Sequence, residues 1–225
     1  MSFLERELGK AFKAELEKNE YILLDNIEHQ RYRTHFKVYL NKRVPTNGLR
    51  FRQFWKAKSL PLKYIPPPQP EIDMILVDNH NKWRAVELKA IKKTRRGICP
   101  SYYFGLGQTL AYLSFGFDEV AIWQCYDGNT LDDTEISCYE NALTRIWQPI
   151  RPIVGNTYFK IIKNNGKTRI QTETGRWQDG IGRLDPSTGK HLFISVSDNP
   201  FLNAPTVKAI REFLELQKKE KWDKN

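Results

Sequence analysis

Apolar residues recur along the chain with two spacings, one typical of helices and one typical of strands. An apolar stripe at helical spacing near the N-terminus predicts a helix over residues 3–18. A second helix is predicted at about residues 102–116, and short apolar runs between the two predict strands. The expected strands lie at residues 21–24, 71–78, 82–91 and 118–126. This order of helix, three strands, helix and strand predicts a mixed α/β core.

The last third of the chain has a different pattern. Apolar stretches on either side of Asn165 and Gly166 predict a β-hairpin, because this dipeptide favours a tight turn. Residues 191–197 form a further predicted strand, and Pro205 marks the start of a C-terminal helix. The pattern leaves open whether this part is a small β-rich subdomain or an addition to the core.

The charge distribution points to the kind of partner. The formal net charge is +10, and residues 29–70 hold ten Lys or Arg, seven aromatic residues and no acid. Residues 118–140 hold seven acids and no Lys or Arg. A basic, aromatic surface suits nucleic acid, although a merely solvated surface is the plainer alternative. The cations expected to contact nucleic acid are Arg31, Arg33, Lys42, Arg43, Arg50, Arg52, Lys56, Lys58, Lys92, Lys93, Arg95 and Arg96.

Composition excludes several classes of protein. The cysteines Cys99, Cys125 and Cys138 have no metal-ligand spacing and indicate reduced thiols in an intracellular protein. No apolar run approaches the roughly 20 residues that span a bilayer. The charged N-terminus is unlike a signal peptide. We therefore expect a cytoplasmic protein with no membrane contact and no organic cofactor.

Three charged residues stand in the apolar strands where charge is costly. Glu87 and Lys89 lie two residues apart and so share a strand face, and the hairpin length can bring Asp73 opposite Glu87. Two close carboxylates repel each other and suit a hard cation such as Mg²⁺ or Mn²⁺. Such a cation can activate water beside a phosphate, with the lysine adding positive charge. The plainer alternative is an amphipathic hairpin with a surface Glu–Lys pair.

Asp73 followed by Glu87-Leu88-Lys89, behind Pro70, resembles the signature of the PD-(D/E)XK nucleases. The resemblance implies a restriction-endonuclease-like core with a central mixed sheet flanked by helices. It also implies that Asp73 and Glu87 hold the metal, that Leu88 can lend its backbone carbonyl, and that Lys89 assists the attacking water.

Two of the acidic positions have alternatives that the sequence leaves open. Asp73 precedes an apolar run and matches the first acid of the signature better than Glu71 does, but Glu71 could share its role. Residues 5–12, ERELGKAF, resemble the opening helix of archaeal Holliday-junction resolvases, whose glutamate supplies a further metal ligand. The motif matches Glu5, although Glu5 lies about one helical turn too far from the next strand. Glu15 lies nearer the middle of the apolar stripe and is the alternative.

The second predicted helix carries Gln108 and Tyr112, which resemble the QxxxY element of RecB-like nucleases. Leu106, Leu110 and Leu113 form one stripe of this helix, so Gln108 and Tyr112 are expected on the opposite side, facing the site or the substrate. Ordinary capping and packing roles are the alternative for both.

These observations lead us to expect a metal-dependent DNA endonuclease that could select for DNA structure and that acts as a homodimer by analogy with the family. The resemblance covers about residues 3–126, so we expect a core at 1–149 with a basic insertion at 29–70 and an extension at 150–225 packed on it. This layout also resembles nuclease-like proteins of spindle-shaped archaeal viruses, which would place the protein in the host cytoplasm. The alternatives are a nucleic-acid-binding protein that does not cut, a partner of an acidic protein, and an RNA enzyme or RNA binder.

Overall fold

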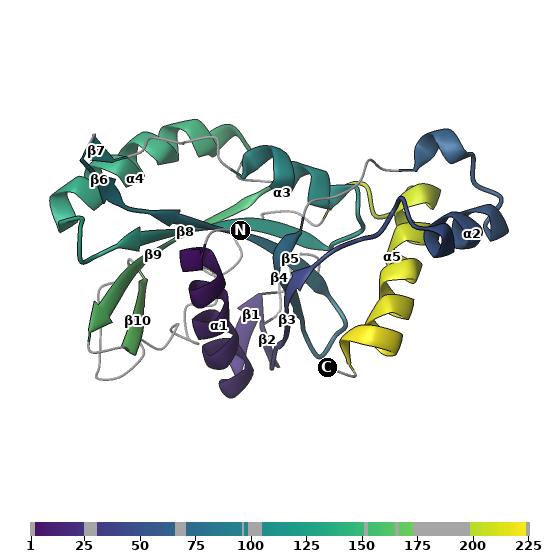
Figure 1. Ribbon diagram of the computed structural model, residues 1–225, viewed down its shortest axis with the longest axis horizontal. Coiled ribbons are helices and arrows are strands. Elements are labelled where there is room, and N and C mark those ends of the chain that lie inside the picture. Colours follow the sequence, from purple (N-terminus) through teal and green to yellow (C-terminus); the bar gives the residue numbers. More distant parts are fainter. Residues whose placement is uncertain are drawn as a thin grey trace.

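A six-stranded mixed β-sheet forms the centre of the molecule (Figure 1). The computed structural model describes residues 3–24, 31–65, 71–95, 97–98, 105–150, 153–164, 167–172 and 199–223. In the order β10-β9-β8-β5-β4-β3, the strands are Lys167–Thr172, Gly155–Asn164, Glu119–Asp127, Trp83–Ile91, Ile72–Val77 and Lys37–Lys42. β8 pairs parallel with both β5 and β9, and the other neighbours are antiparallel. The expected mixed α/β fold is confirmed.

Helices cover both faces of the sheet (Figure 1). They are α1 (Phe3–Lys18), α2 (Leu49–Ala57), α3 (Leu106–Leu113), α4 (Asp133–Trp147) and α5 (Pro205–Gln217), which continues into a π-helical turn at Lys218–Trp222. α1 packs on one face with the separate hairpin of β1 (Tyr21–Leu24) and β2 (Arg31–Thr34), and α2 to α5 pack in a second cluster on the other face. The remaining short elements are 3₁₀ turns at Leu62–Tyr64 and Gln148–Ile150, and the strands β6 (Lys93–Thr94) and β7 (Gly97–Ile98).

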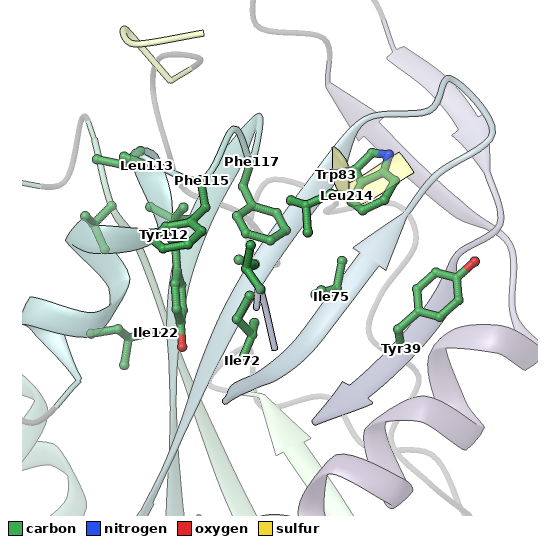
Figure 2. Packing of buried hydrophobic residues seen from close by; sticks show 14 of the residues in the cluster. Tyr39, Ile72, Ile75, Trp83, Tyr112, Leu113, Phe115, Phe117, Ile122 and Leu214 are labelled. Carbon is green, nitrogen blue, oxygen red and sulfur yellow. The ribbon is translucent and has the colours of Figure 1, made fainter. Parts of the chain in front are cut away.

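Strand β5 lies in the middle of the sheet and is covered on both faces, as a central strand with a parallel neighbour requires. Val86 and Leu88 belong to the cluster beneath α1, whereas Trp83 belongs to the cluster beneath α2 to α5. Figure 2 shows Trp83 in that second cluster with Ile75 from β4 and Leu214 from α5. Charged residues on β5 are therefore held between two apolar layers.

The segment that the sequence left undecided joins the central sheet. β9 pairs parallel with β8, beginning at Gly155 opposite Ala121, and β10 returns antiparallel along β9. Lys167 pairs with Asn164, which fits the predicted hairpin, although its turn at residues 165–166 lies outside the described residues. The predicted strand at residues 191–197 also lies outside them. This part of the chain adds strands to the core.

The C-terminal helix is anchored on the same core. Phe213 of α5 meets Phe51 of α2 edge-to-face, with ring centroids 4.9 Å apart. The Arg211 guanidinium lies 4.5 Å from the Trp83 ring centroid and donates to the carbonyl oxygen of Gly116 at 2.9 Å. These contacts tie both α5 and the basic segment containing α2 to the sheet.

Side chains of α1 cover part of the outer edge of β3. The Val38 N–H donates to the Glu17 carboxylate at 2.9 Å, and the Lys13 ammonium donates to the Val38 carbonyl at 2.8 Å. Lys13 and Glu17 also form an ion pair at 3.4 Å. Both outward backbone groups of Val38 are thus satisfied without another strand, which limits edge-to-edge pairing.

Two helices were missed by the sequence patterns. α2 lies within the basic segment and buries Phe51 and Trp55, which are one turn apart. α4 lies where acids dominate, but Tyr139 and Leu143 are buried one turn apart on the sheet side. In both helices a short apolar stripe was present and the surrounding charge obscured it.

Two further expectations concern membrane-spanning helices and the cysteine thiols. None of the helices in the described ranges combines the length and the apolar character needed to cross a membrane. Cys125 is a buried free thiol and Cys138 an exposed one, while Cys99 lies outside the described residues.

A buried ion network lies at the N-terminal end of β5. The Arg84 guanidinium donates to Asp78 at 2.7 Å, to Glu119 at 2.9 Å and to the Tyr32 hydroxyl at 2.9 Å. Burial alone would raise the pKa of Asp78, but the Arg84 charge and hydrogen bonds hold that pKa below its usual value. The network thereby links β2, β5, β8 and the turn after β4.

Replacing Arg84 with Ala should lower the free energy of unfolding by about 3–5 kcal/mol, because two buried carboxylates would lose their counter-charge. The matched control is Arg33→Ala, which breaks an exposed ion pair with Glu20 at 3.5 Å and should cost less than about 1 kcal/mol. Urea unfolding of both variants measures the difference. Equal losses would show that the Arg84 network contributes no more than a surface pair.

Candidate active site

The sheet opens between β4 and β5 at the position of the predicted site. The β4–β5 ladder ends at Met74 opposite Val86, whereas β5 continues along β8 as far as Ile91. Continued by one residue beyond the ladder, the same register sets Asp73 opposite Glu87, and the Glu87 charge acts on Asp73. Among the described strands, none pairs with the β4-facing edge of β5 beyond this point. The fork therefore leaves room for side-chain chemistry at the end of a rigid ladder.

Where the ladder ends, the Asp73 carboxylate accepts the hydrogen bond that a backbone carbonyl of β4 would otherwise accept from β5. Its Oδ2 accepts a hydrogen bond from the Leu88 N–H at 2.9 Å. A strand residue directs its N–H and C=O to the same side, so the Leu88 carbonyl also faces the fork. Asp73 Oδ1 accepts no hydrogen bond from a described residue.

Glu87 is almost fully buried and has a donor at each oxygen. The Lys89 ammonium donates to Oε1 at 2.6 Å, and the Tyr112 hydroxyl of α3 donates to Oε2. Burial, and after it the Glu87 charge, raises the pKa of Tyr112, so its hydroxyl stays protonated and able to donate. Hydrogen bonds at both oxygens therefore hold the Glu87 side chain in a fixed orientation.

Asp73 is buried beside this carboxylate without an ammonium of its own. Burial, followed by the Glu87 charge, raises the pKa of Asp73 to about 7, although the Leu88 N–H and the Lys89 charge act in the opposite direction. Near neutral pH the carboxyl therefore exchanges a proton. A cation at the fork would relieve the same repulsion that favours this proton.

Gly105, which no sequence pattern singled out, packs closely against the side chains of Glu87 and Lys89. Gly105 precedes α3 with a φ of +86°, and a Cβ placed on it would lie 2.7 Å from Lys89 Cε and 2.9 Å from Glu87 Cγ. Only glycine combines this backbone conformation with this space. Gly105 allows the backbone before α3 to pack directly on the two charged side chains. Its sequence signal was only a glycine inside the helix predicted at about residues 102–116, and an isolated glycine in a helical pattern does not indicate a site.

The buried face of α3 differs from the expected one. Thr109, Tyr112 and Leu113 are buried, whereas Leu110 is 40% exposed, so the predicted stripe through Leu110 was wrong. The Thr109 hydroxyl donates to the Gly105 carbonyl oxygen at 2.8 Å, which makes its burial possible. Figure 2 shows the Tyr112 ring within the apolar cluster, and the Tyr112 hydroxyl donates to Glu87.

Gln108, the other residue of the QxxxY-like element, does not share the surroundings of Tyr112. Its side chain is half-buried and makes no hydrogen bond with a described residue, while Tyr112 is fully buried. The structure thus brings Tyr112 into contact with the acid pair and leaves Gln108 outside these contacts.

The two glutamates of α1 lie in different surroundings. Glu5 is half-buried, and its charge contributes to the raised pKa of Asp73. Glu15 is buried near the other end of the helix, where its carboxylate accepts a hydrogen bond from Asn19 at 2.7 Å and its charge acts on Tyr21. Electrostatics therefore groups Glu5, rather than Glu15, with Asp73.

Glu71 also differs from Asp73 in its contacts. Its carboxylate forms an ion pair with Arg43 at 3.1 Å, and its side chain is 20% exposed. Asp73 contacts the backbone of β5 instead. The arrangement pairs Glu71 with a surface cation and Asp73 with the buried fork.

Few side chains at the fork could act as metal ligands. Within the described ranges, no three or more His, Cys, Asp or Glu side chains form a group that could hold a metal ion. Mg²⁺ is usually held by one or two carboxylates together with waters, so Asp73 and Glu87 satisfy this requirement without a third acid. Asp73 Oδ1 and the fork-facing Leu88 carbonyl add oxygen atoms of the type that Mg²⁺ and Mn²⁺ prefer.

The predicted nucleic-acid contacts divide into paired and unpaired cations. Several form ion pairs with acids, namely Arg33, Arg43, Arg50, Lys58 and Lys93. Lys42 lies 5.9 Å from the ring centroid of Trp222. The exposed side chains of Arg52, Lys56, Lys92 and Arg95 make no ion pair or hydrogen bond with a described residue. Arg96 and the side chain of Arg31 lie outside the described part of the chain.

Replacing Asp73 with Asn should stabilise the metal-free protein increasingly as the pH rises from 5 to 8. The pKa of Asp73 rises from 3.8 in the unfolded chain to about 7 when folded, so the folded state binds more protons and loses stability across this range. Between pH 5 and pH 8 the effect corresponds to at most about 3 kcal/mol. Thermal unfolding of both proteins in EDTA at pH 5 and pH 8 measures it. An advantage of the variant that does not change with pH would contradict the raised pKa.

Comparison of the chain with protein-family models, with curated proteins and with solved structures gave no match. The likeness of its motifs to the nuclease signature therefore remains a resemblance. The chemistry of the fork must be judged from the contacts of Asp73, Glu87, Lys89 and Tyr112 alone.

Proposed function

We propose that the protein is a divalent-metal-dependent DNA endonuclease that hydrolyses phosphodiester bonds at the fork between β4 and β5. The observation that carries the proposal is the buried pair of Asp73 and Glu87, with the Lys89 ammonium on the same strand face as Glu87. Buried carboxylates that share a site and are incompletely neutralised are typical of catalytic positions. The order of α1, β3 to β5, α3 and β8 agrees with the core that the resemblance implies.

Each residue of the fork has a part in this proposal. Asp73, Glu87 and the Leu88 carbonyl would hold Mg²⁺ or Mn²⁺, which when bound supplies an acidic water and positive charge beside the phosphate. Lys89 places its ammonium against a non-bridging phosphate oxygen, where negative charge develops. Tyr112 holds Glu87 in place. Glu5 is the residue of α1 best placed to act on the same site.

The distribution of cations supports a polyanionic substrate. Arg52 and Lys56 lie one turn apart on α2, and Lys92 and Arg95 follow the site strand directly. Without acidic partners among the described residues, these side chains are available to phosphates, and such contacts bind the backbone without reading sequence. Cutting two strands, or a four-way junction, needs two sites, and we extend the proposal to a homodimer on that ground.

One observation favours a second candidate function, a nucleic-acid-binding protein that does not cut. Both oxygens of Glu87 already accept hydrogen bonds, from Lys89 and from Tyr112. A carboxylate neutralised in this way could serve only to stabilise the fold. A cleavage assay separates the two candidates.

Cleavage should require Asp73 and a divalent cation. We expect the protein to cut at least one of linear, single-stranded, nicked or four-way-junction DNA in Mg²⁺ or Mn²⁺, and to stop cutting in EDTA. Asp73→Ala should abolish cleavage and leave DNA binding intact, whereas the matched control Glu71→Ala should keep cutting because Glu71 pairs with Arg43. Gel assays with labelled DNA measure both. Persistent cleavage by Asp73→Ala would remove Asp73 from the mechanism, and binding without cleavage on every DNA form would favour the second candidate.

DNA affinity should depend on the unpaired cations of α2 more than on the paired ones. The double variant Arg52→Ala/Lys56→Ala should bind more weakly and reduce the slope of log affinity against log salt by about 2, or about 1 for each phosphate that the variant no longer neutralises. The matched control is Arg50→Ala/Lys58→Ala, whose cations are paired with Glu220 and Glu212. Fluorescence anisotropy at several salt concentrations gives the slopes. Equal slopes for the two double variants would show that Arg52 and Lys56 contact DNA no more than Arg50 and Lys58 do.

A further inference from the structure

Gln124 of β8 lies beside Lys89 in the sheet. The two residues are paired in the parallel register of β5 and β8, whose strands lie about 4.8 Å apart. The flanking pair of Leu88 and Trp123 faces the cluster beneath α1. Because strand residues alternate between faces, Lys89 and Gln124 both point to the opposite face, the face of Glu87.

The amide of Gln124 has a fixed orientation. Its Nε2 donates to Asn156 Oδ1 of β9 at 3.2 Å, and Asn156 Nδ2 donates to the Tyr158 hydroxyl at 2.8 Å. These hydrogen bonds direct the nitrogen of the Gln124 amide toward β9. The carbonyl oxygen, on the other arm of the planar amide, is therefore directed toward β5 and Lys89.

Within the described part of the chain, that carbonyl oxygen has no donor, although the side chain is buried. Gln124 is 4% exposed, and its Oε1 accepts no hydrogen bond from a described residue. An apolar residue would fit this central strand without the cost of burying an amide. An acceptor held here, on the site face, indicates a donor that arrives during function.

We infer that Gln124 is a positioning residue for Lys89, an inference that rests on the proposed function. In the present structure the Lys89 ammonium, which is 21% exposed, donates to Glu87 Oε1. An ammonium carries three N–H groups. When one of them points at a phosphate oxygen of bound DNA, Gln124 Oε1 accepts another and keeps the ammonium from returning to Glu87.

The test compares variants of Gln124 that keep or remove the acceptor. Gln124→Leu should lower kcat for DNA cleavage by about 10- to 100-fold, the usual effect of losing a residue that orients a catalytic group, with KM and DNA affinity unchanged. Gln124→Glu keeps an acceptor and should recover most of the rate. Thr157→Val is the control, because Thr157 pairs with Trp123 and so lies on the opposite face of the sheet. A Gln124→Leu variant that cuts as fast as the wild type would overturn the inference and leave the proposed function standing.

A second readout does not depend on cleavage. In protein labelled with ¹⁵N at its lysine side chains and bound to phosphorothioate duplex DNA, the Lys89 ammonium should exchange its protons slowly, and Gln124→Leu should speed this exchange. Lys89→Met identifies the signal. If the wild-type protein cuts no DNA, the proposed function fails, and this measurement still decides the contact. Ammonium exchange that is the same in wild type and Gln124→Leu would show that Gln124 does not hold Lys89.

Discussion

The candidate site depends on the hydrogen bond from the Leu88 N–H to the Asp73 carboxylate. β4 and β5 form a regular ladder up to Met74 and Val86, and then a side chain takes over as the acceptor. This exchange lets the strands separate without leaving a buried N–H unsatisfied, which would cost about 1–3 kcal/mol. It also fixes a buried carboxyl group beside Glu87, where two negative charges repel each other unless a proton or a cation neutralises one of them. Lys89, Tyr112 and the raised pKa of Asp73 all follow from this one placement.

Strand β5 carries buried charge at two places, at Arg84 near its start and at Glu87 in its middle, and the two places are balanced differently. Arg84 donates to two carboxylates and a hydroxyl, so every partner in that network is engaged. At Glu87 the carboxylate accepts a hydrogen bond at each oxygen, while the neighbouring Asp73 carboxyl has a donor from the described residues at only one oxygen and exchanges a proton near neutrality. A network that serves only stability gains nothing from incomplete neutralisation. The contrast within a single strand is the clearest physical reason to assign chemistry to the fork.

Much of the fold could be predicted because its signals are local. The helix at residues 3–18 and the strand at residues 21–24 have the predicted bounds, and Asp73 comes opposite Glu87 because hairpin length fixes register. The α3 face was mispredicted because that short helix is apolar on several sides, and its pattern does not show that Tyr112 turns inward, where its ring packs in the apolar cluster and its hydroxyl donates to Glu87.

Other features of the site had no local signal at all. Gly105 is required by side chains that precede it by more than a dozen positions in the chain, and its own neighbours do not reveal this. Gln124 lies beside Lys89 only because of the register of β8 against β5, and neither strand's sequence determines that register by itself. Periodicity identifies the face on which a residue lies, but it does not identify the neighbour across the next strand.

The covered edge of β3 has a consequence for assembly. Because Lys13 and Glu17 engage both outward backbone groups of Val38, a second copy cannot continue the sheet there without displacing side chains already bonded to the strand. Pairing of two six-stranded sheets through this edge is therefore disfavoured at Val38. Two copies that act on paired DNA strands would then meet either through packed side chains or through the opposite sheet edge at β10, and only the second contact would set the spacing of their cutting sites by the repeat of a β-ladder.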